Sequence, residues 1–356
     1  MKPPAVPLAI DSYGDLKALG DSASLLNLAW TIDERQCIGI NLDDLIAAEL
    51  KAESSEGLPF MNRYLVDDPY GEGLLSGPVR AYFANSDWSP CIVSGAGVIS
   101  LLQALAALTR DTQVHVVGNT YPDFPHWIHV AGGVHTSQRG QAEMIFLERP
   151  SLMGDQLDGL GDVRKLCFSA SERGAVVLVD ESNANYRPPA FSAVNLTAEV
   201  DNLIVLRGMS KGYGMGGLRL GLCIASELLQ GRVRKVVPPL LASSLSLRIG
   251  ARILSMGDVA EPLRERIRVN RDIAKALLVG AGFGVVDASE GFPYLFLRGD
   301  PSKVLPELEA RGVLGKSHMI WSSSDRSVQV MPRVSVPLSE ARMEILQRAL
   351  SGSARR

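Results

Sequence analysis

The sequence predicts an α/β protein with a large three-layer αβα domain and a smaller α+β domain toward the C-terminus. Short apolar runs alternate with helical patterns along most of the chain, which is typical of a mainly parallel sheet. These runs contain few polar residues, so helices are expected to cover the strands on both faces. From about Ser255 onward the alternation gives way to a mixed pattern with fewer strands, which indicates a second domain.

The strands and helices of the large domain follow from this pattern. Six apolar runs predict strands, at residues 91–94, 113–117, 143–147, 175–179, 203–206 and 220–224. Helical patterns at 98–108 and 157–169 lie between them. We therefore expect residues 46–254 to form the large domain.

The remainder, residues 255–356, is expected to form the small domain. It begins with a long amphipathic stretch at 261–278. Two further strands and two helices are predicted, at residues 292–297, 328–336, 301–311 and 339–350.

The composition is that of an ordinary globular protein and argues against one class of function. With 356 residues the chain can bury a large core, and 46% hydrophobic with 21% charged residues is ordinary for a globular protein. A net charge of -3 argues against a general nucleic-acid binder, because little here would neutralise a phosphate backbone.

The cysteines and the apolar stretches indicate a cytoplasmic protein. Cys37, Cys91, Cys167 and Cys223 form no CxxC pair and stand mostly in apolar runs, as reduced core cysteines do. The first residues lack an apolar signal core, and no run of about 18 apolar residues exists. None of the five histidines forms a metal-ligand pattern with the cysteines, so no metal is expected.

The segment 203–223 carries the clearest chemical pattern. Lys211 follows an apolar run and Ser210, and Gly217-Leu-Arg219-Leu-Gly comes shortly afterwards. A lysine in a glycine-rich turn, beside a hydroxyl and an arginine, can form a Schiff base with an aldehyde whose phosphate its neighbours neutralise. Pyridoxal phosphate is the cofactor that requires such a lysine, hydroxyl and arginine. The alternative is a surface lysine in a glycine-rich loop.

An acid ends the apolar run of the segment 175–186. Asp180 is therefore expected at the carboxyl end of a buried strand, where open parallel sheets place ligand groups. A carboxylate there can pair with the pyridine nitrogen of the cofactor and keep it protonated. The alternative is an acid that caps the following loop or helix.

Three further features suit the same cofactor. Gly95-Ala96-Gly97 stands between a strand and a helix, where backbone amides and the helix dipole favour a phosphate. Tyr121 follows a strand and can lay its ring on a flat cofactor, or be a core aromatic. Tyr64, in a polar loop, can present its hydroxyl to a phosphate, or be an exposed tyrosine without a ligand.

Together these segments resemble the fold type I pyridoxal-phosphate enzymes. Within them the chain is most similar to the class I/II aminotransferases of the histidinol-phosphate aminotransferase branch, over residues 26–350. The most specific match is Arg207-x-x-Ser210-Lys211, followed by Gly217-x-Arg219-x-Gly221.

The resemblance implies roles for individual residues. Lys211 would form the Schiff base, the internal aldimine, and move the proton, and Ser210 and Arg219 would bind the phosphate. The remaining cofactor contacts implied are Asp180 at the ring nitrogen, Tyr121 on the ring face, and Gly95, Ala96 and Gly97 at the phosphate. Tyr64 would reach the phosphate of a neighbouring subunit, which implies a homodimer with shared sites.

The resemblance also implies how the substrate is held. Arg333 matches the small-domain arginine that clamps the α-carboxylate, a group that suits a guanidinium fork; the alternative is a surface arginine on an edge strand. Residues 1–45 would join the small domain and cover the site, which makes Trp30 a candidate for the substrate pocket. Phe124, His126 and Met319 are further candidates.

Two positions depart from the family pattern. Ser151 stands where relatives have an asparagine that bonds the phenolic oxygen of the cofactor, and Asn183 stands where they have a tyrosine. Tyr186 could fold back into the place of that tyrosine. The second arginine of histidinol-phosphate enzymes has Lys316 as its nearest counterpart, which speaks against histidinol phosphate as the substrate.

Three functions remain open on these grounds. The first is an aminotransferase acting on an amino acid, with transamination through the Lys211 Schiff base. The second is a lyase, cyclase, decarboxylase or oxidase of specialised amino-acid biosynthesis, motivated by Ser151 and Asn183. The third is a non-catalytic regulator with this fold, against which the retained lysine, aspartate and arginine speak.

Overall fold

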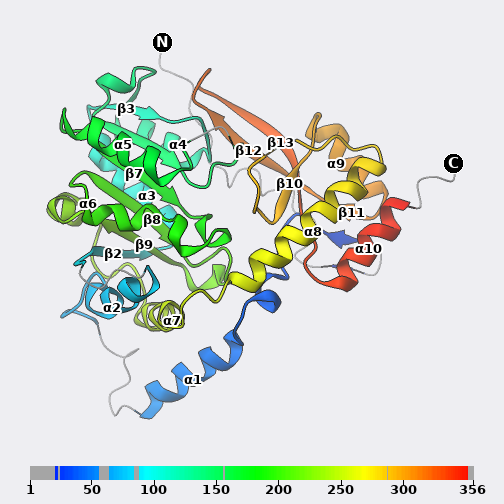
Figure 1. The fold of residues 1–356 in the computed structure, drawn as a ribbon, viewed down its shortest axis with the longest axis horizontal. Coiled ribbons are helices and arrows are strands. Elements are labelled where there is room, and N and C mark those ends of the chain that lie inside the picture. Colours follow the sequence, from blue (N-terminus) through cyan, green and yellow to red (C-terminus); the bar gives the residue numbers. More distant parts are fainter. Residues whose placement is uncertain are drawn as a thin grey trace.

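The computed structural model describes residues 21–22, 25–55, 64–83, 88–154, 157–286 and 288–351. Figure 1 shows a large part built on one sheet beside a smaller part built on another. The predicted boundary near Ser255 stays a prediction. That residue ends helix α7 (Ser244–Ser255), and the long helix α8 (Glu261–Gly280) then crosses the smaller part.

The large part contains a seven-stranded sheet in the order β2-β9-β8-β7-β6-β3-β5. Its strands are β2 (Cys91–Ala96), β3 (Gln113–Val116), β5 (Val134–His135), β6 (Met144–Glu148), β7 (Val176–Glu181), β8 (Leu203–Gly208) and β9 (Leu220–Ala225). All pairs from β8 to β5 are parallel, and β9 runs antiparallel to both β8 and β2. The expected mainly parallel sheet is confirmed, with β9 as its one reversed strand among the described residues.

Alternate residues of the central strands pack into two separate cores. Val177, Val179 and Val205 belong to one core, and Leu178 and Ile204 belong to the other. The first core includes side chains of α2 (Glu72–Tyr82), α5 (Leu160–Ser171) and α7, and the second includes side chains of α3 (Val98–Leu105), α4 (Asp123–Ala131) and α6 (Gln230–Val236). Helices therefore cover both faces, and the three-layer prediction is confirmed.

The smaller part is built on a four-stranded antiparallel sheet, in the order β10-β13-β12-β4. Its strands are β10 (Tyr294–Phe296), β12 (Lys316–Ser322), β13 (Ser327–Ser335) and β4 (Asn119–Thr120). Helices α9 (Pro301–Ala310) and α10 (Glu340–Ser351) accompany α8, and the N-terminal β1 (Leu26–Asn27) pairs with β11 (Val313–Leu314). Chain segments from far apart in the sequence thus meet here.

Strand β4 ties the two parts together just before Tyr121. Trp321 pairs with Thr120, and Ser322 pairs with Asn119. The sequence did not predict β12, because its residues show no regular alternation of polar and apolar side chains. Helices α1 (Leu42–Ser55), α2, α4, α6 and α7 were also not predicted.

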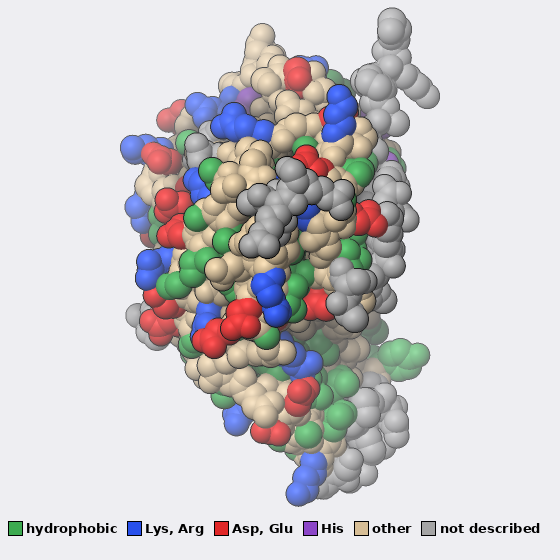
Figure 2. All heavy atoms as spheres, turned by 90° about the vertical axis from the view of Figure 1, so that its right-hand side faces the viewer, with side chains coloured by type: hydrophobic (Ala, Val, Ile, Leu, Met, Phe, Trp, Pro, Cys, Tyr) green, Lys and Arg blue, Asp and Glu red, His purple; other side chains and the backbone are tan. Residues whose placement is uncertain are grey.

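The described surface carries charges of both signs. Figure 2 shows acidic and basic side chains interspersed over the face that the smaller part presents. This mixture fits the small net charge of -3. None of the helices in the described part of the chain has the length and apolar character that a membrane crossing requires.

Candidate active site

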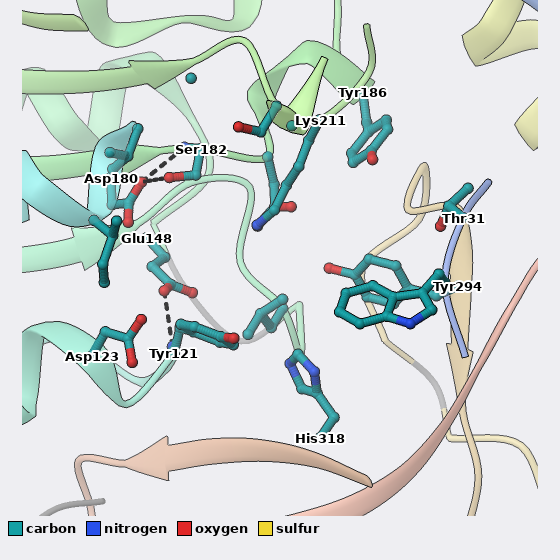
Figure 3. A pocket seen from close by; sticks show the side chains of 18 of the residues that line it. Thr31, Tyr121, Asp123, Glu148, Asp180, Ser182, Tyr186, Lys211, Tyr294 and His318 are labelled. Carbon is teal, nitrogen blue, oxygen red and sulfur yellow. Dashed lines mark hydrogen bonds between the residues drawn. The ribbon is translucent and has the colours of Figure 1, made fainter. Parts of the chain in front are cut away.

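A cavity of about 1030 Å³ opens where β6, β7 and β8 end, and the smaller part and the N-terminal segment close its other side. This is the edge at which parallel sheets place ligand groups. The polar side chains that line the cavity include Thr31, Glu34, Arg35, Tyr121, Asp123, Glu148, Asp180, Ser182, Asn183, Tyr186, Ser210, Lys211, Arg219, Tyr294, Lys316, His318 and Arg333. Figure 3 shows several of them converging on Lys211.

Lys211 stands in the loop that follows β8. The next residue, Gly212, has a φ of 78°, and a Cβ there would lie 2.7 Å from the Cβ of Asn185, so this turn requires glycine. The Asn185 amide donates to the Lys211 carbonyl oxygen at 2.7 Å, which fixes the lysine backbone. A tight and anchored turn thus aims the lysine into the cavity.

The Lys211 amine points toward Asp180 and Glu148 (Figure 3). The Lys211 side chain is accessible from the cavity, but the surrounding protein encloses it on the other sides. Desolvation lowers the pKa of Lys211, and the nearby charges of Asp180 and Glu148 partly oppose this change. A lowered pKa enlarges the fraction of neutral, nucleophilic amine.

Asp180 is a buried acid near the end of β7. Its Oδ1 accepts hydrogen bonds from the backbone N–H of Ser182 at 2.8 Å and from the Ser182 hydroxyl. Burial raises the pKa of Asp180, while these two hydrogen bonds favour the ionised form and lower it. Asp180 can therefore face a cationic group in the cavity.

Arg219, Ser210 and the turn 95–97 form a cradle beside Lys211. Arg219 Nη1 lies 3.5 Å from Ser210 Oγ, and Arg219 Nη2 lies 3.5 Å from the Ala96 carbonyl oxygen. Gly97 has a φ of 77°, and a Cβ there would collide with the Arg219 guanidinium. A guanidinium, a hydroxyl and the N-terminus of α3 are the donors that a phosphate needs.

Arg333 reaches the cavity from β13. Its side chain is buried, its Nη2 donates to the Ala29 carbonyl oxygen at 3.1 Å, and its guanidinium lies 4.5 Å from the ring centroid of Tyr294. The Nε of Arg333 has no hydrogen-bond partner within the described residues. A carboxylate would satisfy this buried cation.

Lys316 and His318, from β12, lie near Arg333. Lys316 pairs with Arg333 in register, and its Nζ lies 4.4 Å from the ring centroid of Trp30. Burial lowers the pKa of Lys316 to about 6, and the charge of Arg333 adds to this effect. Burial also lowers the pKa of His318 well below its ordinary value, so its imidazole is neutral.

Most of the predicted site residues meet in this cavity. Trp30, Tyr121, Asp180, Asn183, Ser210, Lys211, Arg219 and Arg333 line it, and Gly95, Ala96 and Gly97 form the turn against Arg219. Their roles stay predictions. Tyr64 is 81% exposed and does not line the cavity of its own chain.

Four further candidates also lie outside the cavity lining. Ser151 is fully buried, and its backbone N–H donates to Asp158. Phe124 packs into the core against Phe146, and neither His126 nor Met319 lines the cavity. The idea that these three residues shape the substrate pocket is therefore not supported.

Tyr186 lines the cavity and is bonded to a residue of the N-terminal segment. Its hydroxyl donates a hydrogen bond of 2.5 Å to Glu34 Oε1, deep on the side of the cavity formed by the N-terminal segment. Burial raises the pKa of Glu34 to about 7. The Tyr186 hydroxyl is thus engaged with Glu34, and whether it replaces the tyrosine missing at Asn183 stays a prediction.

The sequence reasoning missed Glu34, Glu148, Tyr294 and His318, all of which line the cavity. One of them had a usable signal. Glu148 ends the apolar run of β6 in the same way that Asp180 follows the apolar run of β7. The others come from segments whose proximity only the folded chain establishes.

The fold of this chain matches the folds of solved aminotransferase structures. The crystal structure of the histidinol-phosphate aminotransferase from Clostridium acetobutylicum matches with a TM-score of 0.70 and 15% identity, over 92% of this chain and 99% of that one. The crystal structure of L-threonine-O-3-phosphate decarboxylase from Porphyromonas gingivalis matches with a TM-score of 0.68 and 16% identity, over 93% and 99%. At these identities the likeness concerns the fold.

The chain belongs to the family of class I and II aminotransferases. The family profile "Aminotransferase class I and II" matches residues 134–350, which is more than half of the chain. The histidinol-phosphate aminotransferase of Pyrococcus furiosus is 24% identical over 173 residues, which cover 47% of this chain and 49% of that protein. The chain thus matches about half the length of this curated relative.

Membership of this family implies pyridoxal phosphate as the cofactor, and the cavity fits it. The Arg219 cradle excludes a Cβ at Gly97 and offers donors for a phosphate. Lys211 can react with an aldehyde, and Asp180 offers a buried acid to a pyridinium nitrogen. The donor set therefore matches the phosphate, the aldehyde and the ring nitrogen.

Proposed function

We propose that this protein is a pyridoxal-phosphate-dependent aminotransferase that acts on an amino acid. One observation carries the proposal: Lys211, Asp180 and the cradle of Ser210 and Arg219 line a single cavity, with Arg333 in the same cavity. A nucleophilic amine, an acid, a phosphate site and a carboxylate site are the parts that this chemistry requires.

The cofactor would be held by residues from four segments. Ser210, Arg219 and the turn 95–97 would bind its phosphate, and Asp180 would keep its ring nitrogen protonated. Tyr121 would lie on the face of its ring. When bound, pyridoxal phosphate supplies an aldehyde that condenses with amines and a ring that withdraws electrons.

The substrate would be held and deprotonated by two side chains. Arg333 would bind the α-carboxylate through its guanidinium and so fix the orientation of the α-carbon. The Lys211 amine, with its lowered pKa, would accept the α-proton and later return it. The cover formed by Trp30 and its neighbours would limit the access of water.

An amino-transfer assay tests this proposal. Purified protein with pyridoxal phosphate and a panel of amino acids is expected to release the corresponding keto acid and to accumulate the pyridoxamine form of the cofactor. Addition of a keto acid should then restore the original yellow absorbance. Carbon dioxide or ammonia in place of a pyridoxamine form would favour a lyase or decarboxylase.

We also propose a cytoplasmic homodimer in which each subunit completes the site of the other. Support comes from Tyr64, which is 81% exposed, and from its neighbour Val66, which is 74% exposed. Large exposed side chains in one loop are typical of a contact surface. Cys37, Cys91, Cys167 and Cys223 are free, as expected for a reducing compartment.

Mixed dimers test this arrangement. Lys211→Ala and Tyr64→Phe are each expected to reduce activity at limiting cofactor. If Tyr64 acts in the partner's site, a mixed dimer holds one intact site, made of Lys211 from the Tyr64→Phe subunit and Tyr64 from the Lys211→Ala subunit. Mixing the two variants should therefore restore part of the activity. Light scattering should give twice the mass of one chain. A monomer, or mixtures no more active than their components, would contradict the shared site.

A further inference from the structure

Glu148 is a second buried acid at the carboxyl edge of the sheet, where it ends β6. It is the register partner of Asp180 in the neighbouring strand, and both side chains line the cavity. Its Oε1 accepts the backbone N–H of Tyr121 at 2.8 Å, as Figure 3 shows. Its Oε2 is buried and lacks a hydrogen-bond partner within the described residues.

The surroundings of Glu148 favour its protonated form. Burial raises the pKa of Glu148 to about 8, and the negative charge of Asp180 adds to this effect. The other charged or titratable groups that face it are Lys211, Asp123 and Tyr294. Because Ser182 donates two hydrogen bonds to Asp180, Asp180 is the better site for the negative charge.

A neutral carboxyl carries an O–H that needs an acceptor when it is buried. Since Oε1 is occupied by the Tyr121 N–H, the proton belongs on Oε2, which has no partner within the described residues, and Glu148 lines the cavity. The acceptor must therefore come from a molecule that enters the cavity.

The order of the strands indicates which part of the cofactor meets Glu148. The cradle is formed by residues at the ends of β2, β8 and β9, on one side of β7, whereas Glu148 ends β6 on the other side. In pyridoxal phosphate the carbon that carries the aldehyde is flanked by the phosphate arm on one side and by the phenolic oxygen on the other. With the arm in the cradle and the aldehyde at Lys211, the phenolic oxygen would lie toward β6.

Resting on the function proposed above, we propose that Glu148 is a cofactor-binding residue that donates a hydrogen bond from its carboxyl to the phenolic oxygen of pyridoxal phosphate. This role suits the absence of Ser151 from the cavity lining and the engagement of Tyr186 with Glu34. The donor comes from the end of β6 itself and not from the loop after it.

Loss of the proton from Glu148 reverses this interaction. Below a pH of about 8 the carboxyl donates to the anionic phenolic oxygen, and above it a carboxylate would face that oxygen and repel it. Cofactor affinity is therefore expected to fall as the pH rises through this range. Removal of the donor should weaken binding by about 10- to 100-fold, as for a hydrogen bond to a charged group.

The test compares Glu148→Gln and Glu148→Leu with the wild-type protein. Glutamine keeps an acceptor for the Tyr121 N–H and a donor for the cofactor, but it cannot ionise. Equilibrium dialysis against pyridoxal phosphate between about pH 6.5 and 9.5 gives the dissociation constant, and the visible absorbance gives the pH midpoint of the bound chromophore. Glu143→Gln, at an exposed position next to the other end of β6, is the matched control.

The expected result has three parts. Wild-type affinity falls above about pH 8, the glutamine variant binds equally well over the whole range, and the leucine variant binds about 10- to 100-fold more weakly at neutral pH with a shifted chromophore midpoint. The inference is overturned if the Glu148→Leu variant binds the cofactor as tightly as the wild type, or if the Glu148→Gln variant keeps the wild-type pH dependence. A wild-type protein that binds no pyridoxal phosphate refutes the proposed function instead.

Discussion

Replacement of Lys211 by alanine is expected to abolish amino transfer and the yellow colour of the protein with pyridoxal phosphate. Two contributions disappear together: the amine that reacts with the aldehyde and the base that moves the α-proton. The proton-transfer contribution alone predicts a loss of about 10²- to 10⁴-fold in kcat. Turnover should be measured by keto-acid release, and cofactor attachment by borohydride reduction followed by peptide mass analysis.

Lys316 is the matched control for this experiment. It is the other buried lysine of the cavity, and since its pKa is lowered to about 6 its amine is largely neutral near pH 7. It lies over Trp30, on the side of Arg333, away from the cradle of Ser210 and Arg219. Both amines can thus react with an aldehyde, and the two lysines differ in their position relative to the cradle.

The reduced peptide is accordingly expected to carry the label on Lys211 and not on Lys316. Lys316→Gln should keep the chromophore, and Lys211→Ala should lose it. A label on Lys316 in the wild-type protein, or an unchanged chromophore in Lys211→Ala, would contradict the assigned role of Lys211.

Elements with a long apolar pattern were predictable from the sequence, and elements defined by tertiary pairing were not. The buried strands β7 and β8 consist almost wholly of apolar residues before their polar ends, so both the strands and the position of Asp180 could be predicted. Strands β4 and β5 have only two residues each and exist because neighbouring strands pair with them. No local pattern of that length distinguishes a strand from a loop.

The residues of the candidate site likewise differ in how far the sequence predicts them. Lys211 and Arg219 belong to one short segment, so their spacing along the chain indicates their proximity in space. Glu34 and His318 come from the N-terminal segment and from β12, and only the packing of the smaller part brings them to the cavity. Counting along the chain placed Ser151 in the site, but Ser151 is fully buried and does not line the cavity.

Replacement of Glu181 by alanine is expected to cause the largest loss of stability. The Glu181 side chain is fully buried next to Asp180, and its carboxylate pairs with Arg149 at 2.7 Å and with Arg207 at 3.2 Å. Ser192 and the Ala193 N–H also donate to it. Its removal leaves two buried guanidinium groups without their counter-charge, which costs about 3–5 kcal/mol.

The same network anchors the loop of Lys211. Arg207 Nη2 donates to Asn185 Oδ1 at 2.7 Å, and the Asn185 amide donates to the Lys211 carbonyl oxygen. Glu181→Ala should therefore also weaken cofactor binding, although Glu181 does not line the cavity. Urea denaturation followed by circular dichroism measures the first effect, and equilibrium dialysis against pyridoxal phosphate measures the second.

Glu199→Ala is the matched control for Glu181→Ala, because it removes a glutamate that is also paired with an arginine. The pair of Glu199 and Arg164 has an N–O distance of 2.7 Å, but both side chains are more than 40% exposed, and water replaces the lost contact. The denaturation midpoint of Glu199→Ala should therefore stay close to that of the wild type. Equal midpoints for the two variants would show that burial of Arg149 and Arg207 does not make their counter-charge necessary. In that case Glu181 would not be what holds the Lys211 loop in place.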